Sequence, residues 1–188
     1  MSQTTTKARK QINGVDVQRL METVGAIQED PSLGAFEFRA HNEWIDGTKN
    51  RSRIQDFYGA GKEDDTRARP FVLENDEPAV MTGKDEAPNP VEFVLHGLAG
   101  CVTTTMVAHA ASRGIEIESI ASELEGDIDV RGFLGLSEDV PKGYSEIRVN
   151  LKVKSDAPAE KLAELAQYSP VYNTLVRPVN VVLRVEKA

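Results

Sequence analysis

The chain has 188 residues, of which 40% are hydrophobic and 28% are charged, a size and composition typical of one folded domain and too apolar for a disordered chain. Twenty-two lysines and arginines stand against 30 aspartates and glutamates, so the net charge is -8. A surface of that sign repels nucleic-acid phosphates and anionic membranes. We therefore expect neither nucleic acid nor a membrane as a partner.

The single cysteine, Cys101, excludes an intramolecular disulfide and a cysteine-built metal site. His96 and His109 lie thirteen residues apart on a predicted helix and do not share a face, so we expect no metal site and no cofactor. Residues 1–12 are polar and threonine-rich and lack the apolar core of a signal peptide. We expect a cytoplasmic protein in which residues 1–12 are a disordered tail.

Taken in chain order, the first half predicts one helix and three strands. Apolar residues recur at helical spacing over residues 17–27, and Pro31 closes that segment, so residues 13–33 are predicted to be a helical extension. Residues 34–42 and 51–58 are predicted strands of one hairpin. Residues 70–74 predict a third strand.

The long apolar segment of residues 90–114 predicts a buried core helix. Asn89 is a good N-cap, Pro90 suits the first helical position, and Gly114 ends the segment. Three threonines, two histidines and a glutamate interrupt its apolar residues, which argues against a membrane span.

After this helix, alternating residues 115–130 and 144–154 predict two long antiparallel strands. Residues 157–168 predict a helix, a short helical turn follows Pro170, and residues 178–185 predict a final strand. This order lacks strand-helix-strand alternation, so the sequence predicts an α+β fold.

Two runs of sequence carry a family resemblance. The run APNPVEFVLHGLAGCVTTT (residues 87–105), followed by YSPVYNTL (residues 168–175), resembles the OsmC/Ohr family of thiol peroxidases. The resemblance extends over roughly residues 34–187, and we expect an OsmC-like domain at 34–188. It implies antiparallel sheets packed on a long central helix, in an intertwined homodimer whose active sites lie at the subunit boundary.

Active members of this family reduce organic hydroperoxides with a helix-borne cysteine, a second cysteine in a Cys-Pro turn, and an arginine and a glutamate around the first. By resemblance, Cys101 occupies the peroxide-attacking position. The second cysteine is replaced by Ser169, so an external thiol would have to reduce an oxidised Cys101. The glutamate position holds Val91, so Glu92, the next residue, is the candidate for the catalytic acid. On a regular helix Glu92 points about 180° away from Cys101, so this role requires a helix that is bent near its start.

For the family's arginine, the first hairpin offers Lys49, Arg51 and Arg53, and we expect Arg51 to take that role. A guanidinium is always charged and presents a planar fork to a thiolate or a peroxide oxygen. The alternative is that Arg51 has no catalytic role and belongs to a solvated hairpin tip, where charged residues are also common.

We expect a pocket beside the cysteine, built mainly from helix positions three or four residues away from it. His109, eight residues after the cysteine, is either a base near that pocket or a structural histidine. The predicted pocket residues are Val91, Gly97, Leu98, Thr104, Thr105, Tyr168 and Tyr172.

Two functions remain open at this point. The first is an OsmC-like homodimer that reduces organic hydroperoxides through the Cys101 thiolate and an external thiol reductant. The second is a non-catalytic OsmC-like dimer that binds a small hydrophobic ligand, with Cys101 as a packing residue.

Overall fold

The computed structural model describes residues 11–177 and 179–187. These residues divide into two compact units, one comprising Asp16–Val94 and the other comprising Gln11–Val15 and the chain from Leu95 onward. Helices and antiparallel sheets occur together, which confirms the predicted α+β class. Of the tail predicted to be disordered at residues 1–12, residues 1–10 lie outside the described residues. The last two residues of that tail form strand β1 (Gln11–Ile12), so the prediction is wrong for them.

The first unit begins with helix α1 (Val17–Glu29), which confirms the helix predicted there. Asp16 caps it, because the Asp16 carboxylate accepts a hydrogen bond from the N–H of Arg19. A 3-10 helix, η1 (Pro31–Gly34), follows.

Two three-stranded antiparallel sheets complete the first unit. One has the strand order β4 (His41–Asp46), β5 (Lys49–Ile54), β8 (Phe71–Asn75). The other has the order β3 (Glu37–Phe38), β6 (Phe57–Gly59), β7 (Lys62–Asp64). The predicted third strand is confirmed as β8.

The hairpin prediction is confirmed for β4 and β5, which are joined by a tight turn that contains Gly47 at φ +54°. Each of its two predicted strands is nevertheless interrupted, so that residues 34–42 and 51–58 contribute to both sheets. The hairpin of β6 and β7 was missed because residues 59–69, rich in charge and glycine, indicated only a loop. Its turn uses Ala60 and Gly61, which both have positive φ.

Helix α2 (Pro90–Ser112) begins as predicted, and Gly114, at φ +72°, lies in the turn that follows it. Apolar residues lie all round the helix, a pattern typical of a helix that is covered on more than one side. Among the described residues it is the one helix long and apolar enough to cross a membrane, a property that the core helix of a soluble protein shares.

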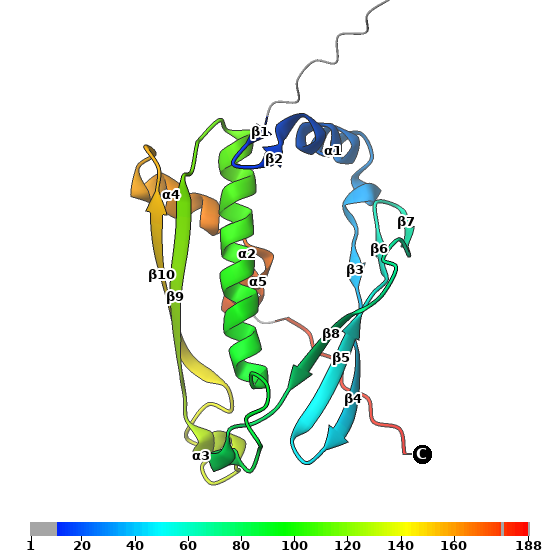
Figure 1. Ribbon diagram of the computed structural model, residues 1–188, viewed down its shortest axis with the longest axis vertical. Coiled ribbons are helices and arrows are strands. Elements are labelled where there is room, and N and C mark those ends of the chain that lie inside the picture. Colours follow the sequence, from blue (N-terminus) through cyan, green and yellow to red (C-terminus); the bar gives the residue numbers. More distant parts are fainter. Residues whose placement is uncertain (1–10, 178, 188) are drawn as a thin grey trace, which may run out of the picture. The chain divides into compact units, whose positions relative to one another are not determined.

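In the second unit, α2 runs alongside β9 (Ser119–Ile128) and β10 (Tyr144–Lys154) (Figure 1). These strands form an antiparallel pair, as predicted. Helix α4 (Ala159–Ala166) completes the core, in which Leu162 and Leu165 contact Met106 and Ala110 of α2. The fold therefore confirms antiparallel strands packed on a long central helix. Two short helices, α3 (Val130–Phe133) and α5 (Pro170–Val176), follow β9 and α4.

Strands β1 and β2 (Val15–Asp16) form a small hairpin whose turn residues, Asn13 and Gly14, both have positive φ, as a type I′ turn requires. The Asn13 amide donates to the carbonyl of Ile115 at 2.9 Å and accepts from the N–H of Ile117 at 2.8 Å. Residues 11–15 therefore belong to the second unit.

The final strand predicted for residues 178–185 is not formed. Residue 178 lies outside the described residues, and residues 179–187 carry no strand. Apolar residues alternate there at Val179, Val181, Leu183 and Val185, but no strand of the described chain pairs with them. Val181 is 80% exposed and Leu183 is 85% exposed.

Candidate functional site

Cys101 lies at the edge of the covered face of α2. The buried stripe of this helix consists of Leu98, Val102, Met106 and Ala110, one residue every four positions. Cys101 directly precedes Val102 of this stripe in the sequence, and its free thiol is half-buried.

Small residues flank the thiol. A Cβ atom added at Gly97 or at Gly100 would meet no atom of the described residues within 4 Å. Beyond the backbone of α2 itself, there is therefore open space for at least a methyl group at each of these two glycines.

The predicted pocket residues on α2 have different environments. Leu98 is 3% exposed and is a core residue. Val91, Gly97 and Thr105 are half-buried, and Thr104 is exposed. Of these, Gly97, Thr104 and Thr105 combine helical proximity to Cys101 with access to solvent.

Glu92 is engaged in capping α2. Its carboxylate accepts from the N–H of Asn89 at 2.8 Å, and the Asn89 side chain accepts from the N–H of Glu92 at 2.9 Å. This reciprocal pair is a capping box. The arrangement gives Glu92 a structural role at the start of the helix.

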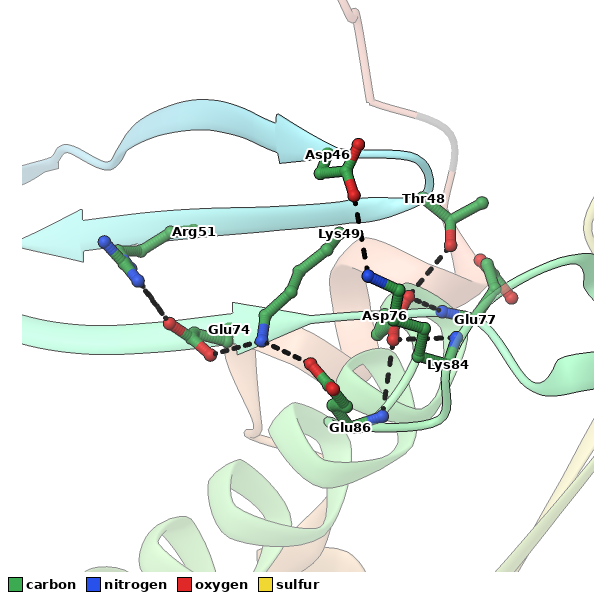
Figure 2. Close-up of polar contacts among 9 residues, drawn as sticks. All are labelled: Asp46, Thr48, Lys49, Arg51, Glu74, Asp76, Glu77, Lys84 and Glu86. Atoms are coloured by element: carbon green, nitrogen blue, oxygen red, sulfur yellow. Dashed lines mark hydrogen bonds and ion pairs between the residues drawn. The ribbon is translucent and has the colours of Figure 1, made fainter.

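Arg51 is held by a carboxylate that the sequence analysis missed. Strands β5 and β8 place Arg51 opposite Glu74, and Nε and Nη2 of Arg51 donate to Glu74 Oε1 at 3.0 and 2.7 Å. Lys49 Nζ lies 3.2 Å from Glu74 Oε2 and 2.9 Å from Glu86 Oε2 (Figure 2). The hydrogen bonds from Arg51 and Lys49 lower the pKa of Glu74, so its carboxylate stays charged and orients both cations.

Asp76 fixes the loop that carries Glu86. Its side chain is 2% exposed and accepts from Thr48 Oγ1 at 2.8 Å and from the N–H groups of Glu77, Lys84 and Glu86 at 2.9, 3.0 and 3.3 Å (Figure 2). Burial, the largest single effect, raises the pKa of Asp76, but the hydrogen bonds together outweigh it and hold the pKa at about 2. A short 3-10 helix, η2 (Ala79–Met81), lies inside this loop.

Sequence reasoning had only one signal for this cluster, the prediction of two strands, at residues 51–58 and 70–74, that carry charged residues. Opposite charges directly across an antiparallel pair stabilise it. The register that places Arg51 against Glu74 could not be derived, because the loop between the strands is long.

Ser169, at the family's second-cysteine position, is fully buried. Its hydroxyl accepts from the N–H of Tyr172 at 3.2 Å and caps helix α5, with Pro170 at the first helical position. Tyr172 is 36% exposed and Tyr168 is 59% exposed.

His109 stacks on Tyr168, with ring centroids 4.4 Å apart. Arg113 Nη1 lies 2.9 Å from His109 Nδ1. Burial, and then the charge of Arg113, lower the pKa of His109 from its ordinary 6.5, so the ring is neutral at pH 7. Within residues 11–177 and 179–187, no three His, Cys, Asp or Glu side chains are grouped so as to hold a metal.

The predicted site residues are divided between the two units. Arg51 lies with Glu74 and Lys49 in the first unit. Cys101 and Ser169 belong to the second unit.

The sequence profile of the family described as OsmC-like protein matches residues 83–184, more than half of the chain. The protein therefore belongs to the OsmC family. The match includes Glu92, Cys101 and Ser169 and begins after Arg51 and Glu74. None of the curated proteins compared with the chain matches it.

Solved structures with the same fold include an OsmC-like protein from Mycoplasma pneumoniae, which is 17% identical, with a TM-score of 0.56 and coverage of 74% of this chain and 87% of that one. A candidate osmotic stress induced and detoxification response protein from Psychrobacter arcticus 273-4 is 15% identical, with a TM-score of 0.55 and coverage of 74% and 88%. An OsmC-like protein of unknown function from Vibrio cholerae O1 biovar eltor is 13% identical, with a TM-score of 0.50 and coverage of 73% and 92%. At these identities the likeness establishes the fold.

Proposed function

We propose that this OsmC-family protein reduces organic hydroperoxides through Cys101, with an external thiol as reductant. The observation that carries the proposal is the position of Cys101, a half-buried free thiol on α2 beside Gly97 and Gly100. Membership of a family whose active members use a cysteine at this place supports it.

The proposed reaction has three steps. The Cys101 thiolate attacks the outer peroxide oxygen, the O–O bond breaks, and the alkoxide takes a proton to leave as an alcohol, so that Cys101 becomes a sulfenic acid. A first external thiol displaces water and forms a mixed disulfide. A second thiol releases the Cys101 thiol and leaves as the reductant's disulfide. Because the chain has one cysteine, both reducing equivalents come from outside.

We assign Arg51 to stabilising the thiolate and the departing alkoxide. Glu74 engages Nε and Nη2 of Arg51, which leaves Nη1 to donate to a reacting oxygen or sulfur. In this scheme Glu74 replaces the family's helix-borne glutamate as the partner of the arginine.

A homodimer is part of the proposal. Helix α2 is apolar all round, yet its buried residues are confined to Leu98, Val102, Met106, Ala110 and Ala111. The unpaired alternating segment of residues 179–187 adds an exposed apolar edge. Apolar surface of this extent usually marks an interface, and a two-fold symmetric dimer is the commonest way to cover it. We also propose a cytoplasmic location, which fits a lone cysteine that must stay reduced.

The alternative is a non-catalytic dimer that binds a small hydrophobic ligand beside α2. Two observations favour it: Glu92 is engaged in capping, and Ser169 is buried as the cap of α5. In this alternative Cys101 contributes only to packing.

One experiment separates the two. The wild-type protein and Cys101→Ser are incubated with cumene hydroperoxide and dithiothreitol, peroxide loss is followed, and sulfenic acid is trapped with dimedone for mass spectrometry. The proposal expects turnover and one dimedone adduct at Cys101 in the wild type alone. If Cys101 is unmodified after excess peroxide, the peroxidase proposal is wrong and the ligand-binding alternative is favoured.

A further inference from the structure

A hollow of about 340 Å³ lies at the C-terminal end of α2 in the second unit. Its volume is within the range of small-molecule sites. It combines two cations and one carboxylate with the exposed ring of a tyrosine. The lining residues are Arg113, Lys161, Glu164, Leu165, Gln167 and Tyr168.

Arg113 is fixed at the edge of this hollow by one of its nitrogens. Nη1 donates to the carbonyl of His109 at 2.9 Å and lies 2.9 Å from His109 Nδ1 and 3.3 Å from Ser112 Oγ. The guanidinium carbon lies 5.9 Å from the centre of the Tyr168 ring. The side chain is therefore held in one orientation before any ligand binds, which reduces the entropy that binding costs.

The remaining edge of Arg113, formed by Nε and Nη2, has no hydrogen-bond acceptor among the described residues. Two other arginines use this same edge for a carboxylate: Arg51 donates through it to Glu74, and Arg131 donates through it to Asp129. Two parallel N–H groups on one edge match the two oxygens of a carboxylate or a phosphate.

The charge of Arg113 also lacks compensation within the described part of the chain, where no carboxylate forms an ion pair with it. His109 does not supply a negative charge, since the imidazole accepts from the guanidinium as a neutral ring. Arg113 therefore places a positive charge with a vacant bidentate edge beside the hollow.

We propose that this hollow binds a small organic carboxylate, whose two oxygens accept hydrogen bonds from Nε and Nη2 of Arg113. Lys161 lies 2.8 Å from Glu164, and its ammonium keeps further donors for the ligand. The Tyr168 ring, which is 59% exposed, contacts the ligand's apolar body. Because Glu164 also lines the hollow, a singly charged carboxylate binds better than a phosphate dianion.

Tyr168 is predicted to line the Cys101 pocket as well, but Arg113, the group that binds the carboxylate, has no part in the proposed peroxide chemistry. His109 and Cys101 are eight residues apart on α2, or about 12 Å along the helix axis. Loss of carboxylate binding and loss of hydroperoxide reduction can therefore be measured independently.

The test uses the full-length protein and benzoate as the probe, with benzamide as its neutral counterpart. Binding is followed by NMR through the ring resonances of His109. We expect saturable shifts with benzoate, none with benzamide, weaker binding of inorganic phosphate, and a raised pKa of His109 in the benzoate complex because a nearby anion favours the imidazolium. No saturable shift with benzoate, equal binding of benzamide, or tighter binding of phosphate would overturn the proposal.

Arg113→Gln should weaken benzoate binding by about tenfold or more, and Arg113→Lys, which keeps the charge without the fork, should lie between it and the wild type. Arg69→Gln, at an exposed arginine of the first unit, is the matched control and should bind as the wild type does. Lys161→Gln lies outside α2 and is the substitute test if Arg113→Gln does not fold. It should also weaken benzoate binding. Wild-type affinity in either Arg113→Gln or Lys161→Gln would contradict the assignment.

Discussion

Asn89 and Glu92 cap helix α2 reciprocally: each side chain accepts a hydrogen bond from the other residue's backbone N–H, at 2.9 and 2.8 Å. Two of the N–H groups that lack an intrahelical partner at this terminus, those of Asn89 and Glu92, are satisfied in this way, and Pro90 between them has no N–H. A carboxylate also interacts favourably with the positive end of the helix dipole. Glu92 therefore contributes to the stability of α2.

The first prediction separates capping from catalysis at Glu92. Glu92→Ala should lower the free energy of unfolding by about 1 kcal/mol, because the capping box is lost. Glu92→Gln should be close to wild type in stability, since glutamine also completes a capping box, and should keep the wild-type rate of peroxide consumption. Urea unfolding and a peroxide assay measure the two effects.

A Glu92→Gln variant as stable as the wild type but with a much lower rate would make Glu92 a catalytic acid. Glu116→Gln, at an exposed glutamate after α2, serves as the control and should change neither quantity.

The second prediction concerns acid unfolding through Asp76. Its pKa is lowered from 3.8 to about 2 in the folded protein, so the unfolded chain binds a proton first as the pH falls. The stabilisation from Asp76 is complete above pH 3.8 and is lost as the pH falls towards about 2. Asp76→Asn should have a lower unfolding midpoint at pH 6 and a flatter decline between pH 4 and pH 2.

In the wild type, the Asp76 carboxylate accepts hydrogen bonds from backbone N–H groups. The asparagine would present an NH2 group to some of these N–H groups and leave buried donors unpaired. Asp46→Asn is the control, because the Asp46 side chain is 74% exposed and its ion-pair distance to Lys84 is 3.5 Å. Thermal unfolding across this pH range gives the comparison. Identical pH profiles for wild type and Asp76→Asn would refute the role given to Asp76.

The elements that sequence predicted correctly have signals within a few residues of their ends. Asn89-Pro90 and Gly114 mark α2, and Asp16 and Pro31 bracket α1. Capping and turn preferences are local properties, so a single sequence reveals them. Cys101 was placed on the central helix for the same reason.

The missed features depend on residues that are far apart in the chain. Predicting the Arg51–Glu74 pair requires the register of β5 against β8. Predicting the role of Asp76 requires the fold of a loop that brings the N–H groups of Lys84 and Glu86 to its carboxylate. The alternation of residues 179–185 is a local pattern that predicts a strand, but no strand forms there. A strand also needs a partner, and the described chain contains none for it.

The third prediction tests whether residues 179–187 lie in a dimer interface. Leu183→Asp should weaken the homodimer strongly, because it would bury a charge in an apolar contact. Arg184→Asp, on the opposite side of the alternating pattern, introduces the same side chain and should leave the dimer largely intact. Light scattering at micromolar concentration compares the two variants with the wild type. Equal masses for Leu183→Asp and Arg184→Asp at the dimer value would exclude this segment from the interface.

The last prediction uses the buried serine at the family's second-cysteine position. In reduced Ser169→Cys the hydroxyl that caps α5 is lost, which should cost about 1 kcal/mol of stability. If the Cα atoms of residues 101 and 169 lie within roughly 7 Å of each other, oxidation should then join Cys101 to the new thiol. Closing a loop of that length would add roughly 4 kcal/mol to the stability of the oxidised variant in the chain-entropy account.

The readouts are the number of free thiols after peroxide treatment and the mass of the linked peptides. Ser169→Cys combined with Cys101→Ser should form no internal bond, and Thr174→Cys, at an exposed position of α5, should leave both thiols free to be alkylated. A disulfide would let a dithiol reductant restore Cys101 faster than a monothiol does, because the neighbouring thiol expels the sulfenic oxygen as water before the reductant arrives. Two free thiols in oxidised Ser169→Cys would mean that this turn does not correspond to the family's Cys-Pro turn, and Cys101 would then depend on external thiols in every variant of this position.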